Sequence, residues 1–311
     1  MSLDVSTSTA PFRIAVVGDI HLHWDEHDVQ FFQQSQYDVV LFVGDLPEYR
    51  LNKVFSLARQ LRSINKPTFL IPGNHDALNM LQLAGEFWRK PWMIRWGAKG
   101  HVKRVQKLKE ALDPIELCGY SCHTLPGSDI SLISGRPHSM GGALNVAPYL
   151  QEAFGVGSME ASGELLCKLV DEAPQRRCLF LAHNGPKGLG SEPGAPWGAD
   201  FTPQPTDWGD ADLQVAMDYA KTSGKEVIGV VAGHMHSPTK NKGRFRKWAT
   251  LLDGSWFVNA ARVPRILERN GQTQHHHIAF DVFPGRTDVY EVWVSDHGDV
   301  ERISAEESSS N

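Results

Sequence analysis

Five short polar clusters in this chain each follow directly on an apolar run, and this repeated arrangement constrains the fold most. The runs are rich in Val, Ile, Leu and Phe and have the length of buried strands. Because the carboxyl ends of parallel strands meet at one edge of a sheet, we expect the clusters to converge. The clusters are Gly18-Asp-Ile-His21, Gly44-Asp45, Gly73-Asn-His-Asp76, Ala182-His-Asn184 and Gly233-His-Met-His236.

Helical segments separate the first of these runs. Between residues 52 and 64 the apolar side chains recur along one helical face, and residues 25–36 also have helix-compatible spacing. The order strand, helix, strand, helix, strand predicts a parallel α/β core. Later runs at 256–260, 276–282 and 288–295 have turns between them, and we expect them to form a second, largely antiparallel sheet.

The length of 311 residues suits one domain, which we expect over residues 11–297, with flexible tails at 1–10 and 298–311. The N-terminus shows neither a basic region nor an apolar signal region, and no apolar run reaches the ~20 residues of a membrane span. The four cysteines form no C-x-x-C pair. We therefore expect a cytoplasmic protein, or a stromal one if it is a plastid protein whose transit peptide is absent.

A basic, tryptophan-rich insertion spans about residues 78–113. Residues 86–109 hold eight Lys or Arg against one Glu, together with Trp88, Trp92 and Trp96. One interpretation is a cap beside the site that attracts an anionic substrate and stacks a ring on its tryptophans. The interpretation that we favour is an amphipathic helix pair whose tryptophans are core and whose lysines are solvated.

The overall charge bears on possible partners. The formal net charge of −5 is mild and gives no reason to expect bulk attraction to nucleic acid or to an anionic membrane. We therefore expect no membrane partner and, with less support from the sequence, no nucleic acid.

The five clusters supply two Asp, one Asn and four His as candidate metal ligands, and that set can hold two divalent ions. Mixed imidazole and carboxylate ligands suit Mn²⁺, Fe or Zn²⁺ better than Mg²⁺, and Mn²⁺ is our first choice. The unused imidazole of His75 is free to protonate a leaving alkoxide, with Asp76 orienting it. The candidate ligands are Asp19, His21, Asp45, Asn74, His183, His234 and His236.

Four residues outside the clusters are candidate substrate contacts. Arg136 and His138 lie in a polar turn at 135–142, and either could touch a phosphate. Trp197 lies in the Gly/Pro-rich segment at 185–210, which we expect to form a lid or wall over the pocket. Arg244 lies in a basic loop that could steer anions. A surface turn or a solvated loop is the competing interpretation in each case.

The motifs GDIH, GD, GNHD, AHN and GHMH resemble, in content and order, those of the calcineurin-like metallophosphoesterases. The resemblance covers about residues 12–260 and implies a four-layer αββα sandwich of two mixed sheets. It also implies hydrolysis of a phosphomonoester or phosphodiester of a small metabolite or nucleotide, and so a small anionic phosphoester substrate as the partner. By this resemblance, one metal would be bound by Asp19, His21 and His236, and a second by Asn74, His183 and His234. Asp45 would bind both metals, and His75 would be the general acid.

Two positions depart from that family pattern. Glu48 stands where relatives commonly have Asp or Asn, and Tyr49 falls one place beyond the tyrosinate position of purple acid phosphatases. The turn at 135–142 and the Gly/Pro-rich segment are similar to an uncharacterised branch found in cyanobacteria and plastids. Two alternatives stay open: a non-catalytic scaffold of the same fold, and a nuclease that uses the basic insertion.

Overall fold

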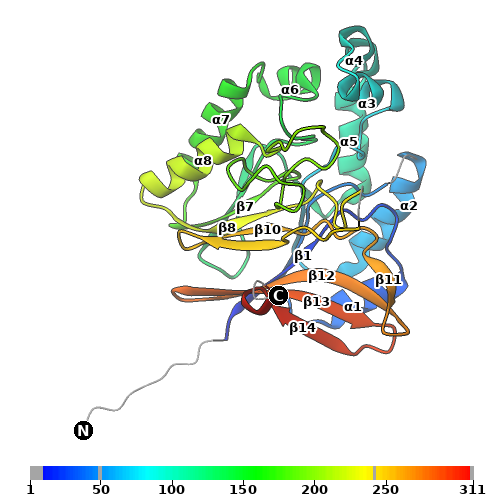
Figure 1. The fold of residues 1–311 in the computed structure, drawn as a ribbon, viewed down its shortest axis with the longest axis vertical. Helices are drawn as coiled ribbons and strands as arrows, with labels where there is room; N and C mark the ends of the chain where they lie inside the picture. Colours follow the sequence, from blue (N-terminus) through cyan, green and yellow to red (C-terminus); the bar gives the residue numbers. More distant parts are fainter. Residues whose placement is uncertain (1–9, 48–50, 241–242, 309–311) are drawn as a thin grey trace.

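Two β-sheets lie face to face between two layers of helices in the computed structural model, which describes residues 10–47, 51–240 and 243–308 (Figure 1). The predicted αββα sandwich of two mixed sheets is confirmed. Across these described ranges, no helix combines the length and the apolar character needed to cross a membrane.

The first sheet has the order β14-β13-β12-β1-β2-β3-β4, with β11 paired to β12. Strands β1 to β4 are parallel, and β11 to β14 add antiparallel strands beside β1. The strands are β1 (Phe12–Val17), β2 (Val39–Phe42), β3 (Thr68–Leu70), β4 (Glu116–Leu117), β11 (Ile266–Arg269), β12 (Gln272–Phe283), β13 (Arg286–Ser295) and β14 (Val300–Ser304). Its outer face packs against α1 (Glu26–Gln34), α2 (Leu51–Leu61), the short helix η1 (Arg62–Ile64) and α5 (His101–Leu112).

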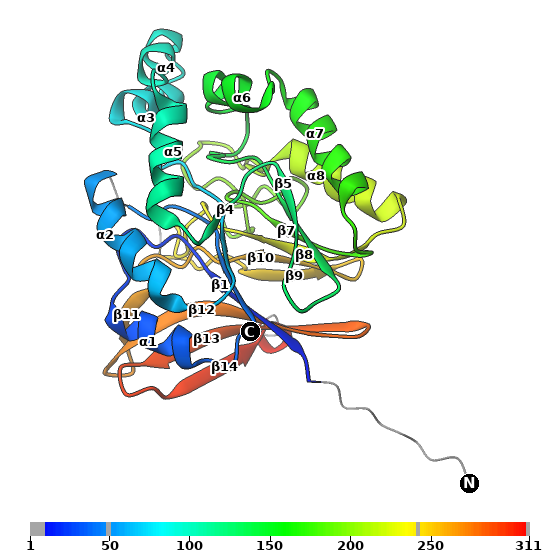
Figure 2. The same ribbon diagram turned by 180° about the vertical axis from the view of Figure 1, so that it is seen from behind.

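The second sheet has the order β5-β6-β7-β8-β10-β9, and its central strands β6, β7, β8 and β10 are parallel. The strands are β5 (Ser121–Thr124), β6 (Ile130–Ser134), β7 (Arg177–Leu181), β8 (Glu226–Ala232), β9 (Ala249–Leu252) and β10 (Ser255–Asn259). Its outer face packs against α6 (Ala147–Phe154), α7 (Met159–Glu172) and α8 (Ala211–Thr222). Helices α3 (Met80–Phe87) and α4 (Pro91–Gly97) project away from both sheets (Figure 2).

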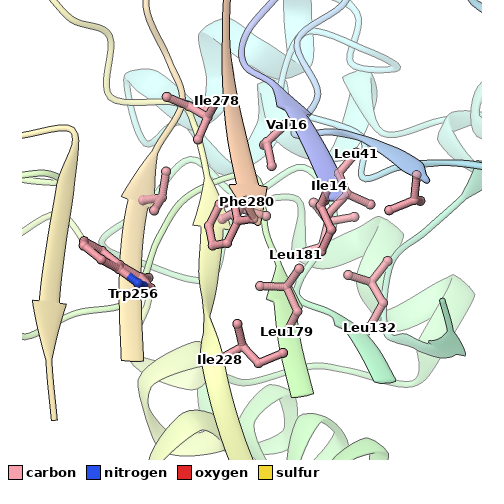
Figure 3. Close-up of a cluster of buried hydrophobic side chains, with 14 of the residues drawn as sticks. Ile14, Val16, Leu41, Leu132, Leu179, Leu181, Ile228, Trp256, Ile278 and Phe280 are labelled. Atoms are coloured by element: carbon pink, nitrogen blue, oxygen red, sulfur yellow. The ribbon is translucent and has the colours of Figure 1, made fainter. Parts of the chain in front are cut away.

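The apolar runs of the sequence are strands buried on both faces. In β1, Ile14 and Val16 point between the sheets, whereas Ala15 and Val17 point toward the helices. Figure 3 shows Ile14 and Phe280 of the first sheet facing Leu179 and its neighbours in the second. Because each strand has a hydrophobic layer on either side, the strands read as continuous apolar runs instead of alternating ones.

The expectation of a separate antiparallel sheet near the C-terminus was wrong. Strand β10 pairs in parallel with β8, whereas β12 and β13 extend the first sheet from the free side of β1. The register places Phe280 of β12 opposite Ile14 and Ile278 opposite Val16. The apolar face of these strands is therefore buried in the core between the sheets rather than in a core of their own.

The expectation of a flexible tail at 298–311 was also wrong for most of that range. Residues Val300–Ser304 pair with β13 as β14, and α9 (Ala305–Ser308) follows with the side chain of Ala305 buried. Pairing satisfies the backbone groups of an otherwise open sheet edge. Residues 309–311, like residues 1–9 of the expected N-terminal tail, lie outside the described part of the chain.

The basic insertion forms three helices, and the interpretation of its tryptophans as core was wrong. The side chains of Trp88, Trp92 and Trp96 on α3, α4 and their connection are exposed. Helix α5 joins the body through Leu108 and Leu112 in the layer beneath the first sheet, and Leu83 of α3 packs against the hydrophobic cluster on the outer face of the second sheet.

A buried ion pair fixes β12 and its neighbours to α1. The guanidinium of Arg265 donates to both carboxylate oxygens of Asp28, at 2.8 and 2.7 Å, and both side chains are almost fully buried. His275 of β12 lies 3.2 Å from the same carboxylate. Burial alone would raise the pKa of Asp28, but Arg265 and His275 hold it well below its usual range.

We predict that Asp28→Asn destabilises the protein by about 3–5 kcal/mol at pH 7, because Arg265 is left as an uncompensated buried charge. A carboxylate with a depressed folded-state pKa contributes stability that is present above its unfolded pKa of about 3.9 and is lost as the pH falls through the folded value. Urea denaturation from pH 7 to pH 3 should therefore show a gap between variant and parent that narrows below about pH 4. The exposed Glu152→Gln is the control; a gap that is constant with pH would contradict this account.

Candidate metal centre

Seven polar side chains from the ends of five strands converge at one edge of the sandwich. They come from the turns after β1, β2, β3, β7 and β8, so both sheets contribute. Candidate ligand atoms of Asp19, His21, Asp45 and His236 lie within 4.8 Å of one another, and those of Asp45, His183 and His234 do so as well. The carboxylate of Asp45 is thus shared by two neighbouring groups.

The first group is held closely around His236. Its Nε2 lies 3.1 Å from Oδ2 of Asp19 and 3.1 Å from Nε2 of His21. The Nε2 atom of His21 in turn lies 3.8 Å from Oδ2 of Asp45. Two imidazole nitrogens and two carboxylates therefore point into one small space.

The second group is centred on Asn74. Its side-chain oxygen lies 3.0 Å from Nε2 of His183 and 3.0 Å from Nδ1 of His234. His183 is fully buried, and its Nε2 also lies 3.6 Å from Oδ2 of Asp45. In the sequence Asn74 lies 109 positions from His183 and 160 from His234, and the structure brings the three side chains together.

Backbone carbonyls determine which nitrogen of two rings carries the proton. Nδ1 of His21 donates to the carbonyl of Pro47 at 3.2 Å, and Nδ1 of His183 donates to that of Val43 at 2.6 Å. In the neutral rings the Nε2 lone pairs then face the centre. For His183 that lone pair faces the oxygens of Asp45 and Asn74, an arrangement that a cation between them stabilises.

The pKa values of most of these side chains suit the same role; burial opposes a charge on His183, but the neighbouring Asp45 and Asp19 raise the pKa of that ring. Burial lowers the pKa of His21, and burial together with the neighbouring His183 lowers that of His234 to about 3. Burial opposes ionisation of Asp45, but His183, His75 and His21 hold its pKa well below the usual range. Neutral imidazoles and ionised carboxylates are the forms that bind metal ions. The residues present therefore fit a pair of divalent cations.

The backbone at the centre is held in an uncommon conformation. His21, Asp45 and His234 have φ angles of 42°, 54° and 68°, in the left-handed region. Each such residue costs about 1–3 kcal/mol and persists only when its surroundings enforce it. Here the backbone N–H of His21 donates to the carbonyl of Asp45, and that of His234 donates to the carboxylate of Asp19. The strain lies at three of the candidate ligands themselves.

Two glycines let neighbouring turns approach the carboxylates. A Cβ on Gly73 would lie 2.2 Å from Oδ1 of Asp45 and 2.5 Å from the ring of His183. A Cβ on Gly233 would lie 2.1 Å from Oδ1 of Asp19. The sequence analysis did not predict that these two positions must be glycine, although both glycines directly precede candidate ligands.

Asp76 braces the turns beneath the centre. Its carboxylate accepts the backbone N–H groups of Gly73, Leu46 and Asp45 at 2.6, 2.7 and 2.9 Å. Burial, with a further contribution from Asp45, raises the pKa of Asp76 to about 7. The side chain thus joins the turn after β2 to the turn after β3. Its expected action on the ring of His75 stays a prediction.

His75 lies at the accessible side of the centre. Its backbone N–H donates to Oδ1 of Asp45 at 2.8 Å, and its Nε2 lies 4.0 Å from Oδ2 of the same residue. The side chain is 15% exposed, in contrast to the fully buried His183. A proton on this ring could therefore reach a molecule bound above the carboxylate.

The expectation that Arg136 touches substrate was wrong. Its side chain is buried, with Nη2 donating to Asp210 at 2.8 Å and Nε donating to Asp212 at 3.0 Å. These two ion pairs hold the turn at 135–142 against the start of α8 and leave the guanidinium unavailable for substrate. The sequence offered no sign of these partners, which lie more than seventy positions away.

His138 and Trp197 are not surface contacts either, because both are buried. Nδ1 of His138 donates to the carbonyl of Gly73 at 2.7 Å, and Nε1 of Trp197 donates to that of Gly233 at 3.2 Å. Each side chain thus supports a glycine that precedes candidate ligands. The expectation that the segment around Trp197 forms a lid or wall over the site stays a prediction.

Two further expectations have different outcomes. Arg244 is exposed in the loop after the last motif, and its contact with substrate stays a prediction. Glu48 and Tyr49 lie outside the described residues.

A residue that sequence reasoning missed is Arg246, which is buried and donates to the carbonyl of His236 at 2.9 Å.

Comparisons with known proteins bear on the family and the fold of the chain. Residues 12–238 match the family model of calcineurin-like phosphoesterases. A dimetal phosphatase from Danio rerio is 10% identical, with a TM-score of 0.51 over 96% of this chain and 99% of its own. A protein from Thermus thermophilus is 11% identical, with a TM-score of 0.48 over 96% and 100%. Among curated proteins, none matches the chain in sequence. At such identities the structural likeness concerns the fold alone.

We predict that Gly73→Ala weakens the binding of Mn²⁺ about 10–100-fold, because the added methyl group displaces the carboxylate of Asp45. Gly194→Ala is the matched control, since a Cβ there meets no atom within 4 Å. Metal titration by calorimetry measures the difference, and circular dichroism checks that both variants are folded. Equal affinities in the two variants would show that the close approach at Gly73 does not matter.

Proposed function

This chain belongs to the family of calcineurin-like phosphoesterases, which are metal-dependent phosphoric ester hydrolases, and we propose that it acts with two metal ions. The proposed substrate is a phosphomonoester or phosphodiester of a small metabolite or nucleotide. The observation that carries the proposal is the position of Asp45, whose carboxylate lies 3.8 Å from His21 on one side and 3.6 Å from His183 on the other. One side chain thereby serves two cation positions.

Each ion has its own set of side chains in this proposal, and Mn²⁺ is our first choice over Fe or Zn²⁺. When bound, two such ions supply a water of lowered pKa and positive charge for the oxygens of the ester. One position is formed by Asp19, His21 and His236, the other by Asn74, His183 and His234, and Asp45 belongs to both.

The chain itself contributes orientation and a proton. The carbonyls of Pro47 and Val43 hold two ligand rings in one tautomer, so their lone pairs need no reorganisation when metal ions bind. His75, on the accessible side, gives a proton from its ring to the departing alkoxide. The exposed Arg244 attracts the anionic ester toward the centre.

The scaffold alternative is disfavoured by the completeness of the site. Proteins that keep such a fold without turnover usually lack ligands or the acid, whereas all seven ligand side chains and His75 are present here. The nuclease alternative needs a cationic groove that follows a nucleic acid backbone. The cations of the insertion lie instead around the projecting helices α3 and α4 and along α5.

We predict that the purified protein hydrolyses p-nitrophenyl phosphate or its bis ester in the presence of Mn²⁺ and loses this activity on chelation. Asp45→Asn should bind fewer than two equivalents of metal, because its amide is a poorer bridging ligand than a carboxylate. Elemental analysis measures the stoichiometry, with the exposed Asp253→Asn as control. Absence of turnover on both esters, together with absence of bound metal, would favour the scaffold.

We predict that His75→Ala lowers kcat on alkyl phosphates by about 10²–10⁴-fold and has a smaller effect on nitrophenyl phosphate. Nitrophenolate is a stable anion and needs little protonation as it departs. Steady-state kinetics on both substrates gives the two ratios, and His297→Ala, an exposed histidine, serves as control. Losses of the same size on both substrates would exclude His75 as the acid.

A further inference from the structure

Helices α3 and α4 form a hairpin, residues 80–97, that exposes large aromatic side chains. The exposed fractions are 71% for Phe87, 61% for Trp88, 60% for Trp92 and 58% for Trp96. Met80 and Leu81 at the start of α3 are exposed as well. Scattered apolar residues on a surface are ordinary, but four aromatic rings within ten residues mark a site of interaction.

The aromatic rings do not form the contact between α3 and α4. A Cβ on Gly85 would lie 2.7 Å from the backbone nitrogen of Ile94, and one on Gly97 would lie 2.4 Å from that of Gln82. The two helices therefore touch through glycines and backbone. The side chain of Asn79 adds a hydrogen bond to the carbonyl of Gly97 at 2.9 Å. Packing within the hairpin thus leaves its aromatic rings outside.

The hairpin is also fixed to the body of the protein. The guanidinium of Arg104 on α5 donates to the carbonyl of Ala77 at 2.6 Å and to those of Lys99 and Gly97 at 2.9 and 3.1 Å. Figures 1 and 2 show α3 and α4 beyond the end of α5, clear of both sheets. The aromatic surface is therefore presented in a preformed arrangement.

Cations accompany the rings, although the whole chain is acidic. Arg89, Lys90, Arg95 and Lys99 are exposed on the hairpin and just beyond it, and Nζ of Lys99 lies 3.9 Å from the centre of the Trp96 ring. The carboxylate of Glu86, the one acidic residue in 80–100, accepts the backbone N–H of Val146. The hairpin is therefore both aromatic and positively charged.

Charge and ring chemistry together select the partner. A second copy of the chain would bring like charges together at this surface. A single-stranded nucleic acid would need a groove, and it would leave the aliphatic Met80 and Leu81 in water. An anionic lipid surface takes tryptophan rings at the level of its headgroups, apolar side chains below them, and Lys or Arg beside its phosphates.

We propose that the hairpin of residues 80–97 docks onto membranes that contain anionic phospholipids. This contradicts the expectation of no membrane partner, which rested on the net charge and on the lack of a spanning segment. Both observations hold for the chain as a whole, but the hairpin concentrates positive charge and aromatic rings locally. The docking is independent of the hydrolysis proposed above.

The test is flotation of the full chain with lipid vesicles. We expect binding to vesicles of roughly three parts phosphatidylcholine to one part phosphatidylserine, weak binding to pure phosphatidylcholine, and loss of binding at high salt. The triple variant Trp88→Ala/Trp92→Ala/Trp96→Ala, and separately Arg89→Gln/Lys90→Gln/Arg95→Gln, should each lower the partition coefficient roughly tenfold or more.

Two controls separate docking from folding and from catalysis. The double variant Val215→Ala/Leu251→Ala removes exposed apolar side chains elsewhere and should bind vesicles as the parent does. Hydrolysis of soluble nitrophenyl esters, where the parent has it, and thermal unfolding should be unchanged in both hairpin variants.

Two results would overturn the proposal, and a third would also assign the surface to another partner. The first is failure of the parent chain to bind phosphatidylserine vesicles, and the second is unchanged binding by both hairpin variants. The third is binding of a single-stranded oligonucleotide, or dimerisation, that both hairpin variants abolish while vesicle binding is absent. That result would assign the surface to nucleic acid or to a second copy.

Discussion

The hydrogen bonds from His21 to Pro47 and from His183 to Val43 are the interactions on which the rest of the centre depends. Both acceptors flank Asp45 at the end of β2, whereas the donors come from the first strand of one sheet and from β7 of the other. The turn after β2 therefore orients rings from both sheets. The bond from His21 lies within the first sheet, whereas the bond from His183 forms only when the two sheets are packed together, so the site is completed by the packing of the fold.

The core between the sheets supplies the rigidity that this coupling needs. Side chains such as Ile14, Phe280 and Leu179 interlock there, and close-packed interiors resist small displacements. Strained backbone at His21, Asp45 and His234 can persist because the strands beneath those turns cannot shift to relieve it. Residues far from the chemistry thereby maintain its geometry.

Prediction from sequence succeeded where the determining signal is local. An apolar run followed by a polar turn identifies a strand end, and so the convergence of Asp45 with the histidine clusters could be anticipated. Strand pairing for β12 and β14 could not, because it depends on distant partners. The burial of Arg136 could not be predicted for the same reason, because the carboxylates that pair with it, those of Asp210 and Asp212, lie far along the chain. The prediction that the tryptophans of the insertion are buried was wrong because α3 and α4 pack through glycines and leave the aromatic rings outside.

The three carbonyls bound by Arg104 have a mechanical consequence. They belong to the segment entering the hairpin at Ala77 and to the segment leaving it at Gly97 and Lys99, so one side chain clamps both connections. The hairpin is therefore held in a fixed orientation relative to α5 instead of being joined to it by two free connections. A partner that binds the hairpin therefore also determines the direction in which the metal centre faces.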